Sequence, residues 1–246
     1  MSILGLNRKS VNHASLSELG RYPLHYDIVK NILKYCYKLE NLPTEFPLLQ
    51  DAFLCSKKLH SMNKTSWYSS VTKLLKIFNI QDNMHLNKSK SGQSLRQSLV
   101  KKYLLNWQRS NDMLKDDKLV TYLFLKTNFG LEKYLTLINN FNYRKSICRF
   151  RVSAHRLYIE TGRYKNIPRN ERLCKNYSAN EIEDEAHFLI KCDKFNNKRE
   201  ELFKLISSKV KNFTKLSNNR KLYYILTCED QEILQSVGRF LYENIP

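Results

Sequence analysis

Residues 23–39 have the sequence PLHYDIVKNILKYCYKL, and this stretch indicates the fold class. Apolar side chains recur in it every three or four residues, which lines them along one face of an α-helix. Pro23 suits the first helical turn, where a missing N–H removes no hydrogen bond. The sequence therefore predicts an amphipathic helix that turns one face to a core. The predicted face consists of Leu24, Ile28, Ile32, Cys36 and Leu39.

Helical periodicity continues on both sides of a polar break. Residues 44–62 and 67–78 are predicted as two more helices, which gives a helical bundle within residues 1–80. Residues 81–94, QDNMHLNKSKSGQS, lose the apolar period and are predicted as a linker. Residues 95–246 are predicted as a helical C-terminal subdomain. The apolar faces of these helices are Leu48, Ala52, Cys55 and Leu59; Val71, Leu74, Leu75 and Phe78; Leu95, Leu99, Tyr103 and Trp107; and Ile233, Leu234, Val237, Phe240 and Leu241.

Composition agrees with a mainly α class. The 246 residues include only 6 Gly and 5 Pro, while 42% are hydrophobic, enough to build a core. The 42 Lys and Arg against 23 Asp and Glu give a formal net charge of +19, more than solubility requires. A polyanion is the natural partner for such a chain, and a phosphate backbone is the commonest polyanion. A membrane surface is the second possibility.

No segment of the sequence is long and apolar enough to cross a bilayer. The longest apolar run, LVTYLFL at residues 119–125, stops at Lys126, well short of about 20 residues. The first twenty residues lack the apolar core and cleavage site of a secretory signal. We therefore expect an intracellular protein, nuclear or cytoplasmic, without a membrane partner and with reduced thiols. Its cysteines are Cys36, Cys55, Cys148, Cys174, Cys192 and Cys228.

The stretch from Arg149 to Lys175 combines basic and aromatic residues. It holds eight Lys or Arg against two acids, and its aromatic rings are interleaved with the arginines. Arginines that reach phosphates and rings that stack on bases are what a single-stranded nucleic-acid groove needs. The alternative is a core made of Phe150, Val152, Leu157 and Ile159 with a solvated basic face. The predicted nucleic-acid-binding residues are Arg149, Arg151, Arg156, Tyr158, Arg163, Tyr164 and Arg172.

Near the end of this stretch and just beyond it, three residues have the spacing of metal ligands. Cys174, His187 and Cys192 form C-x12-H-x4-C, and two thiolates with an imidazole suit Zn²⁺. Tyr177 occupies the position where a zinc knuckle has its second cysteine, and tyrosine is a poor zinc ligand at neutral pH. The fourth ligand is then Asp184, Glu185, Asp193 or water. We expect residues 172–193 to form a small zinc-knuckle-like β hairpin within the helical C-terminal subdomain. The alternative to metal binding is that the former ligands of this hairpin pack as ordinary residues.

The sequence favours a protein without a catalytic site. The acidic run EIEDEAH at residues 181–187 is more typical of a solvated face than of a Mg²⁺ nuclease, since no second acidic cluster completes a two-metal site. There is no phosphate-binding Gly-rich loop, nucleophile elbow or H-E-x-x-H motif. We therefore expect neither enzymatic activity nor a small-molecule substrate.

Several of these segments together point to a known family. The run RFRVSAHRLYIETGRY (149–164), followed by ERLCK (171–175) and IEDEAHFLIKC (182–192), resembles the C-terminal region of non-LTR retrotransposon reverse transcriptases. Weaker similarity covers nearly the whole chain, including SELGRYPLHYDIVKNILKY (17–35) and KLYYILTCEDQEIL (221–234). In that family this region follows the polymerase domain and ends in a CCHC zinc-binding element thought to hold template RNA or target DNA.

The resemblance implies roles for individual residues. Cys174, His187 and Cys192 match three of the family's zinc ligands, and Tyr177 replaces the fourth. The F/Y-x-D-D turn that reverse transcription requires is not found in this sequence. We thus expect a nucleic-acid-binding fragment whose partners are RNA or single-stranded DNA. The alternatives are a structural or protein-interaction remnant that contacts the polymerase domain of a related element, and a product without function.

Overall fold

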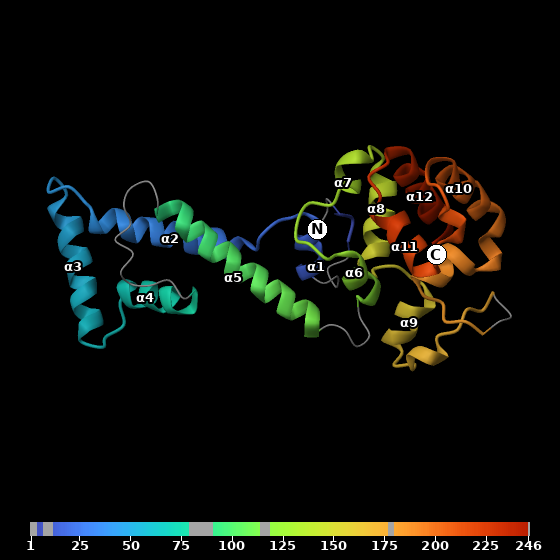
Figure 1. The fold of residues 1–246 in the computed structure, drawn as a ribbon. Coiled ribbons are helices and arrows are strands. Elements are labelled where there is room, and N and C mark those ends of the chain that lie inside the picture. The colour runs from blue at the N-terminus through green and yellow to red at the C-terminus, as the bar shows by residue number, and fades with distance from the viewer. Residues whose placement is uncertain (1–3, 7–11, 79–90, 114–118, 177–179, 246) are drawn as a thin grey trace. The chain divides into compact units, whose positions relative to one another are not determined.

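The computed structural model describes residues 4–6, 12–78, 91–113, 119–176 and 180–245, without the side chains of residues 91–96 and 110–113. The chain is mainly helical, as predicted (Figure 1). In the described ranges, β pairing is limited to two isolated antiparallel bridges, Leu19 with Leu131 and Leu173 with Ile182. The predicted β hairpin is therefore not present as strands. None of the described helices is both long and apolar enough to span a membrane.

The chain divides into two compact units, residues 22–109 and residues 1–21 with 110–246. This division differs from the predicted one at residues 81–94. Residues 79–90 lie outside the described part, and the next helix already starts at Ser91. The helices of residues 22–109 are α2 (Leu24–Glu40), α3 (Pro47–Ser61), α4 (Trp67–Phe78) and α5 (Ser91–Met113), whose last four residues belong to the other unit.

Aromatic residues hold α5 against α2. The ring of Tyr103 lies edge-on to those of Tyr22 and Tyr26, with centroids 5.2 Å apart in both pairs. Tyr26 also packs edge-on against Phe78 at the end of α4, at 5.6 Å. Such pairs contribute about 0.5–1.5 kcal/mol each beyond the burial of their area. These contacts place the helix after residue 91 with the preceding helices instead of with the C-terminal subdomain.

The buried faces of α2 and α3 differ from the predicted ones. Leu24 and Ile28 are 72% and 50% exposed, and the buried positions of α2 are Tyr26, Val29, Leu33, Cys36 and Leu39. In α3 only Phe53 is buried, while Leu48 is 84% exposed. The apolar side chains cover more than half of the circumference of α2 and lie on several sides of α3, so spacing alone could not identify the part that faces a neighbour.

The C-terminal unit is built around α12. Its helices are α1 (Asn12–Glu18), α6 (Val120–Leu125), α7 (Tyr134–Leu137), α8 (Phe141–Arg151), α9 (Tyr158–Tyr164), α10 (Asn196–Lys209), α11 (Asn218–Thr227) and α12 (Gln231–Asn244). The predicted face of α12 is correct, because all five predicted residues are buried. Gly238 allows α8 to approach, since a Cβ there would lie 2.6 Å from the Cβ of Tyr143. Asn140 caps α8, and Asp230 caps α12 through the Ile233 N–H, at 3.0 Å.

Candidate metal centre and nucleic-acid interface

The segment that carries the predicted metal ligands follows α9. It runs through the short helix η2 (Arg169–Glu171), the Leu173–Ile182 bridge, the π-helical turn η3 (His187–Lys191) and the short helix η4 (Asp193–Phe195). Two backbone hydrogen bonds flank the bridge: Cys174 N–H to Glu181 O and Glu183 N–H to Arg172 O, both 2.9 Å. This pairing brings Cys174 next to the turn that contains His187.

The structure brings all three predicted ligands together. One donor atom each from Cys174, His187 and Cys192 lies within 4.8 Å of the others, and all three residues are buried. The two Sγ atoms are 3.9 Å apart. Two sulfurs bound to one tetrahedral Zn²⁺ at about 2.3 Å are about 3.8 Å apart, so the thiols already have the spacing of a zinc site. The donor set, two thiols and one imidazole, is one that zinc prefers.

The π-helical turn explains why His187 and Cys192 converge. The Cys192 N–H donates to His187 O, at 2.8 Å, which closes a ring over five residues. In an α-helix of about 3.6 residues per turn, side chains five positions apart diverge. The wider π turn brings them closer to the same side, and such turns occur frequently at functional sites. The H-x4-C spacing was the only sign of this geometry in the sequence.

Glu181 orients the imidazole. Its Oε2 accepts a hydrogen bond from His187 Nδ1, at 3.2 Å, and the carboxylate also binds Lys191 Nζ at 2.9 and 3.1 Å. These hydrogen bonds, first from Lys191 and then from His187, hold the pKa of Glu181 below its ordinary value, so it is ionised. With its proton on Nδ1, the ring presents the Nε2 lone pair for a metal, the usual arrangement of a carboxylate, a histidine and zinc.

A buried arginine stands beside the second cysteine. Arg199 on α10 is 5% exposed, and its guanidinium donates to the backbone oxygen of Cys192 and, at 2.9 Å, to Asn196 Oδ1. Burial lowers the pKa of Arg199, while the nearby Cys192 raises it. A cation at this position would offset the negative charge of a metal-bound cysteine. Arg199 was not among the predicted site residues.

Without a metal, burial keeps the first cysteine protonated. Burial, with a smaller contribution from the neighbouring Cys192, raises the pKa of the Cys174 thiol to about 11. A metal ion would reverse this preference, since a coordinated thiol loses its proton. Metal binding at this site is therefore coupled to proton release.

The fourth ligand is not supplied by the acids proposed from the sequence. Among the described residues, the cluster contains only Cys174, His187 and Cys192. Asp184 Oδ1 accepts the His187 N–H at 2.8 Å, while Asp193 Oδ1 accepts from Asn196 Nδ2 at 3.1 Å. Tyr177 lies outside the described residues. Of the ligands considered from the sequence, water therefore remains for the fourth position.

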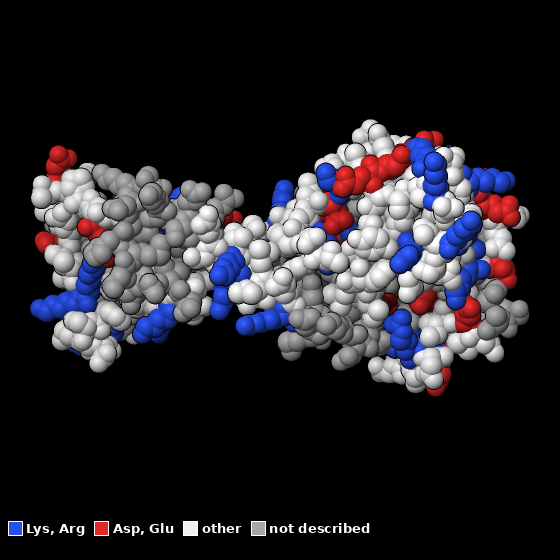
Figure 2. Space-filling model, in the orientation of Figure 1, with Lys and Arg blue, Asp and Glu red and all other residues white. Residues whose placement is uncertain are grey.

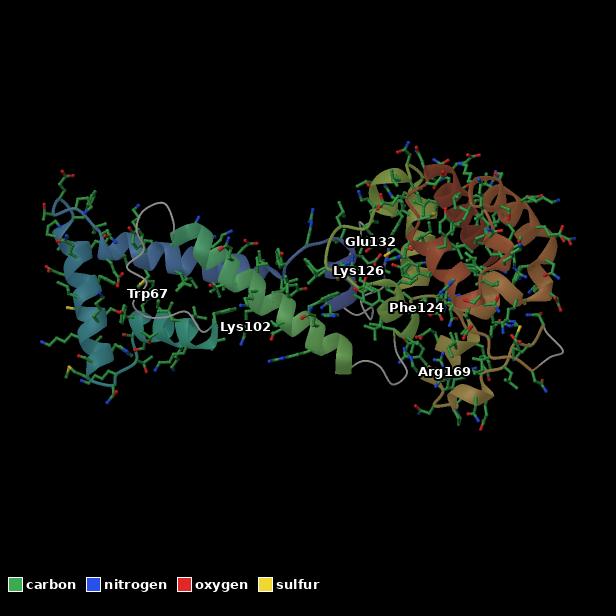
Figure 3. All side chains as sticks on the ribbon, in the orientation of Figure 1. Trp67, Lys102, Phe124, Lys126, Glu132 and Arg169 are labelled. Atoms are coloured by element: carbon green, nitrogen blue, oxygen red, sulfur yellow. The ribbon has the colours of Figure 1, made fainter. Side chains whose placement is uncertain are left out.

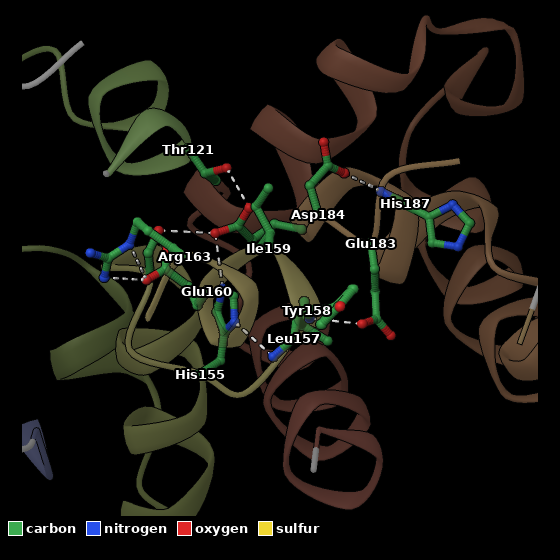
Figure 4. Close-up of polar contacts among 12 residues, drawn as sticks. Thr121, His155, Leu157, Tyr158, Ile159, Glu160, Arg163, Glu183, Asp184 and His187 are labelled. Atoms are coloured by element: carbon green, nitrogen blue, oxygen red, sulfur yellow. Dashed lines mark hydrogen bonds and ion pairs between the residues drawn. The ribbon is translucent and has the colours of Figure 1, made fainter. Parts of the chain in front are cut away.

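Glu185, considered from the sequence as a fourth metal ligand, instead forms hydrogen bonds that join three parts of the C-terminal unit. Its Oε1 accepts from Ser153 Oγ at 3.0 Å and contacts His155 Nε2 at 2.9 Å, while Oε2 accepts from Thr121 Oγ1 at 3.0 Å (Figure 4). The Leu157 N–H donates to His155 Nδ1, at 3.3 Å, so the ring proton is on Nε2 and points to Glu185. His155 and Glu185, 8% and 4% exposed, thus join α6, the end of α8 and the metal segment.

Glu183 connects the metal segment to α9. Its carboxylate accepts the Tyr158 N–H at 2.7 Å, and its backbone oxygen accepts the Ile159 N–H at 3.1 Å (Figure 4). These are N–H groups of the first turn of α9, which an α-helix leaves without internal acceptors. The metal segment therefore fixes the start of the helix that carries the predicted stacking residues.

Two of the predicted phosphate-binding arginines are buried, which corrects the prediction for them. Arg151 is 0% exposed, and its guanidinium binds both Glu18 carboxylate oxygens and Leu226 O. Arg172 is 3% exposed and donates to Ile167 O at 2.8 Å and Ile159 O at 3.1 Å. Guanidinium groups enclosed in this way cannot reach a phosphate, so both arginines stabilise the fold.

The other predicted residues remain accessible to different degrees. Arg156 is exposed, and Tyr164 is 64% exposed with the Arg163 guanidinium 4.5 Å from its ring centroid. Arg163 also pairs with Glu160 at 2.8 Å. Tyr158 is half-buried and has Lys175 Nζ 5.6 Å from its ring centroid, while half-buried Arg149 donates to Gly5 O at 3.0 Å.

Four apolar residues of the stretch from Arg149 to Lys175 are buried, as the alternative interpretation of that stretch expected. Phe150, Val152, Leu157 and Ile159 are at most 5% exposed. Figure 2 shows Lys and Arg at several separate positions on the visible face, with acidic side chains among them. Stacking on α9 and phosphate contact would thus rely on a few side chains, chiefly Arg156, Arg163 and Tyr164.

Comparisons of the chain with protein-family models, with curated proteins and with solved structures found no match.

Proposed function

We propose that this chain is a zinc-stabilised module that binds single-stranded nucleic acid and performs no bond chemistry. The observation that carries the proposal is the convergence of Cys174, His187 and Cys192 from positions 13 and 5 residues apart. The segment that would hold the ion also supplies, through Glu183, the acceptors for the first turn of α9. In this proposal the zinc ion fixes the segment, and the segment positions α9.

The nucleic-acid surface that we propose is the exposed side of α9 and its flanks. Arg156 and Arg163 would contact phosphates, and Tyr164, with an arginine already over its ring, would stack on a base. The net charge of +19 supports an anionic partner. The resemblance to the C-terminal region of non-LTR retrotransposon reverse transcriptases supports RNA or single-stranded DNA as that partner.

A salt series tests this surface. The affinity for a fluorescent 12-nucleotide RNA would be measured by anisotropy for the parent and for Arg156→Ala/Arg163→Ala. Each lost phosphate contact flattens the log–log salt slope by about 0.7 for a single strand, so the double variant should lose about 1.4. The matched control is Arg220→Ala/Arg239→Ala, which removes two exposed arginines from α11 and α12. Equal slopes for the two variants would contradict the placement on α9.

One observation favours the second candidate function, protein association. In residues 22–109, α3 leaves Leu48 84% and Leu54 60% exposed, and Ile77 of α4 is 61% exposed. Large apolar side chains exposed to solvent are candidates for a contact surface where they form a contiguous patch. Tight association with the polymerase domain of a related element that persists at high salt, together with weak RNA binding, would favour this function over the first.

A further inference from the structure

A cavity of about 300 Å³ lies in the C-terminal unit, away from the metal centre and α9. Its walls are residues 125–134, which run from the end of α6 into α7, and Tyr223 with residues 226–229 at the end of α11. This volume is at the lower end of the range for ligand pockets, about 300–1,000 Å³. Neither the metal site nor the proposed surface on α9 uses these residues.

The charged side chains of the cavity are paired with one another. Lys126 binds the Glu132 carboxylate, whose other oxygen lies 2.8 Å from the buried Arg151 guanidinium. Lys133 and Glu229, which also line the cavity, form an ion pair with Nζ and Oε2 3.8 Å apart. The two lysines and two glutamates balance, so a phosphate inside would bring an uncompensated charge. A neutral ligand therefore fits the cavity better than an anion.

Lys126 provides a hydrogen-bond donor in a protected place. Its side chain is 2% exposed although the residue lines the cavity, and Figure 3 shows it close to Glu132. Among the described residues, its acceptors are a Glu132 oxygen and Gly130 O, the latter at 2.6 Å. An ammonium group has three N–H donors, and these two acceptors account for two of them. A carbonyl oxygen or ring nitrogen of a ligand would receive a strong, charge-assisted hydrogen bond.

Aromatic residues form part of the walls. Phe129 and Tyr223 both line the cavity, and Tyr223 is 41% exposed. Phe124, outside the cavity, packs edge-on against Tyr223 with centroids 5.7 Å apart and an interplanar angle of 76°. The cavity therefore offers aromatic rings on which a flat ligand can stack.

We propose that this cavity binds one unpaired nucleobase of the strand that the protein holds. The base is neutral and flat, it carries ring or carbonyl acceptors for Lys126, and it can stack on Tyr223 or Phe129. The inference rests on the proposed nucleic-acid-binding function and adds a base-reading subsite to it.

The test separates base binding from phosphate binding. The anisotropy assay would compare a 12-nucleotide oligouridylate with an abasic strand of the same length and charge. Stacking of one base on an aromatic side chain corresponds to roughly a tenfold affinity difference, so the parent should prefer the oligouridylate by about that factor. Tyr223→Ala should remove most of this preference. Phe124→Ala is the matched control, because it breaks the same ring pair but leaves the cavity wall intact.

Each result has a distinct meaning. If the parent binds neither strand, the proposed function itself fails. If it binds both equally, or if Phe124→Ala and Tyr223→Ala lose the preference alike, the function stands and the base-binding cavity is wrong. An oligouridylate with 4-thiouridine, photocrosslinked to the parent protein, requires no variant at all. Crosslinks in residues 125–134 or 223–229 support the proposal, and their restriction to other peptides overturns it.

Discussion

Arg151 and Glu18 form a two-point ion pair in which neither side chain is exposed to solvent. The Nε and NH2 groups of Arg151 lie 3.0 and 3.1 Å from the two Glu18 oxygens, and Tyr134 OH donates to Glu18 at 2.7 Å. This pair attaches α1 to the C-terminal unit. It also explains why an arginine in a basic, aromatic stretch is a structural residue.

Loss of one partner of this pair should destabilise the C-terminal unit strongly. Glu18→Ala leaves the buried guanidinium with less compensation, and breaking a buried pair costs about 3–5 kcal/mol. Urea unfolding followed by circular dichroism measures the effect. Glu243→Ala, which removes an exposed i,i+4 partner of Arg239, should change stability by less than about 0.5 kcal/mol. Similar losses for both variants would argue against the buried pair.

Two glycines should respond to alanine in opposite ways. Gly238→Ala places a Cβ 2.6 Å from Tyr143 and should cost about 1–3 kcal/mol, because α8 and α12 must move apart. A Cβ at Gly130 would meet no atom within 4 Å, so Gly130→Ala should be neutral or stabilise by up to about 1 kcal/mol. Thermal unfolding of the two variants provides the comparison, and a tolerated Gly238→Ala would contradict the close helix contact.

Asp230 should make the stability of the folded protein depend on pH in the acidic range. Hydrogen bonds from the Ile233 N–H and then from Lys209 lower the pKa of its carboxyl. Its ionised form therefore adds stability above the ordinary aspartate pKa of about 3.9, and this contribution is lost as the pH falls through the lower folded-state pKa. Asp230→Asn keeps a good cap but no charge, so it should flatten the pH dependence below about pH 4. Asp230→Ala should also lose the cap. An unchanged profile in Asp230→Asn would exclude this role.

The orientation of His187 by Glu181 should affect metal affinity. Removal of a carboxylate that holds a metal-binding histidine typically lowers affinity 10–100-fold, so Glu181→Ala should weaken zinc binding by about that factor. Competition with a chromophoric chelator gives the dissociation constants. Glu171→Ala, an exposed acid of the same segment, serves as the control and should bind zinc like the parent.

The sequence was most informative where a pattern had only one physical solution. The face of α12 was predictable because apolar residues cover one side of that helix and polar ones the other. In α2 and α3 the apolar residues cover a broad part of the helix, and contacts with other helices decide which part is buried. Arg151 was misassigned for the same reason, since its partner Glu18 lies 133 residues away. The helix α9 is short and contains Gly162, so periodicity could not reveal it.

The three residues of the candidate metal site were predictable from their types and spacing, but the groups that support them were not. Glu181 and Arg199 act through hydrogen bonds to His187 and to the backbone of Cys192. A carboxylate six residues before a histidine and an arginine seven after a cysteine have no distinctive pattern. Such contacts depend on the path of the chain between the two ligand-bearing turns.

Zinc uptake by the purified protein tests the central claim most directly. Metal-free protein would be titrated with Zn²⁺, alongside Cys192→Ser, the buried-cysteine control Cys36→Ser and Tyr177→Cys. The account predicts one equivalent for the parent and Cys36→Ser, tighter binding by Tyr177→Cys, loss of the site in Cys192→Ser, and proton release on binding. A parent that takes up no zinc, or a Cys192→Ser variant that binds it as tightly as the parent, would contradict the account.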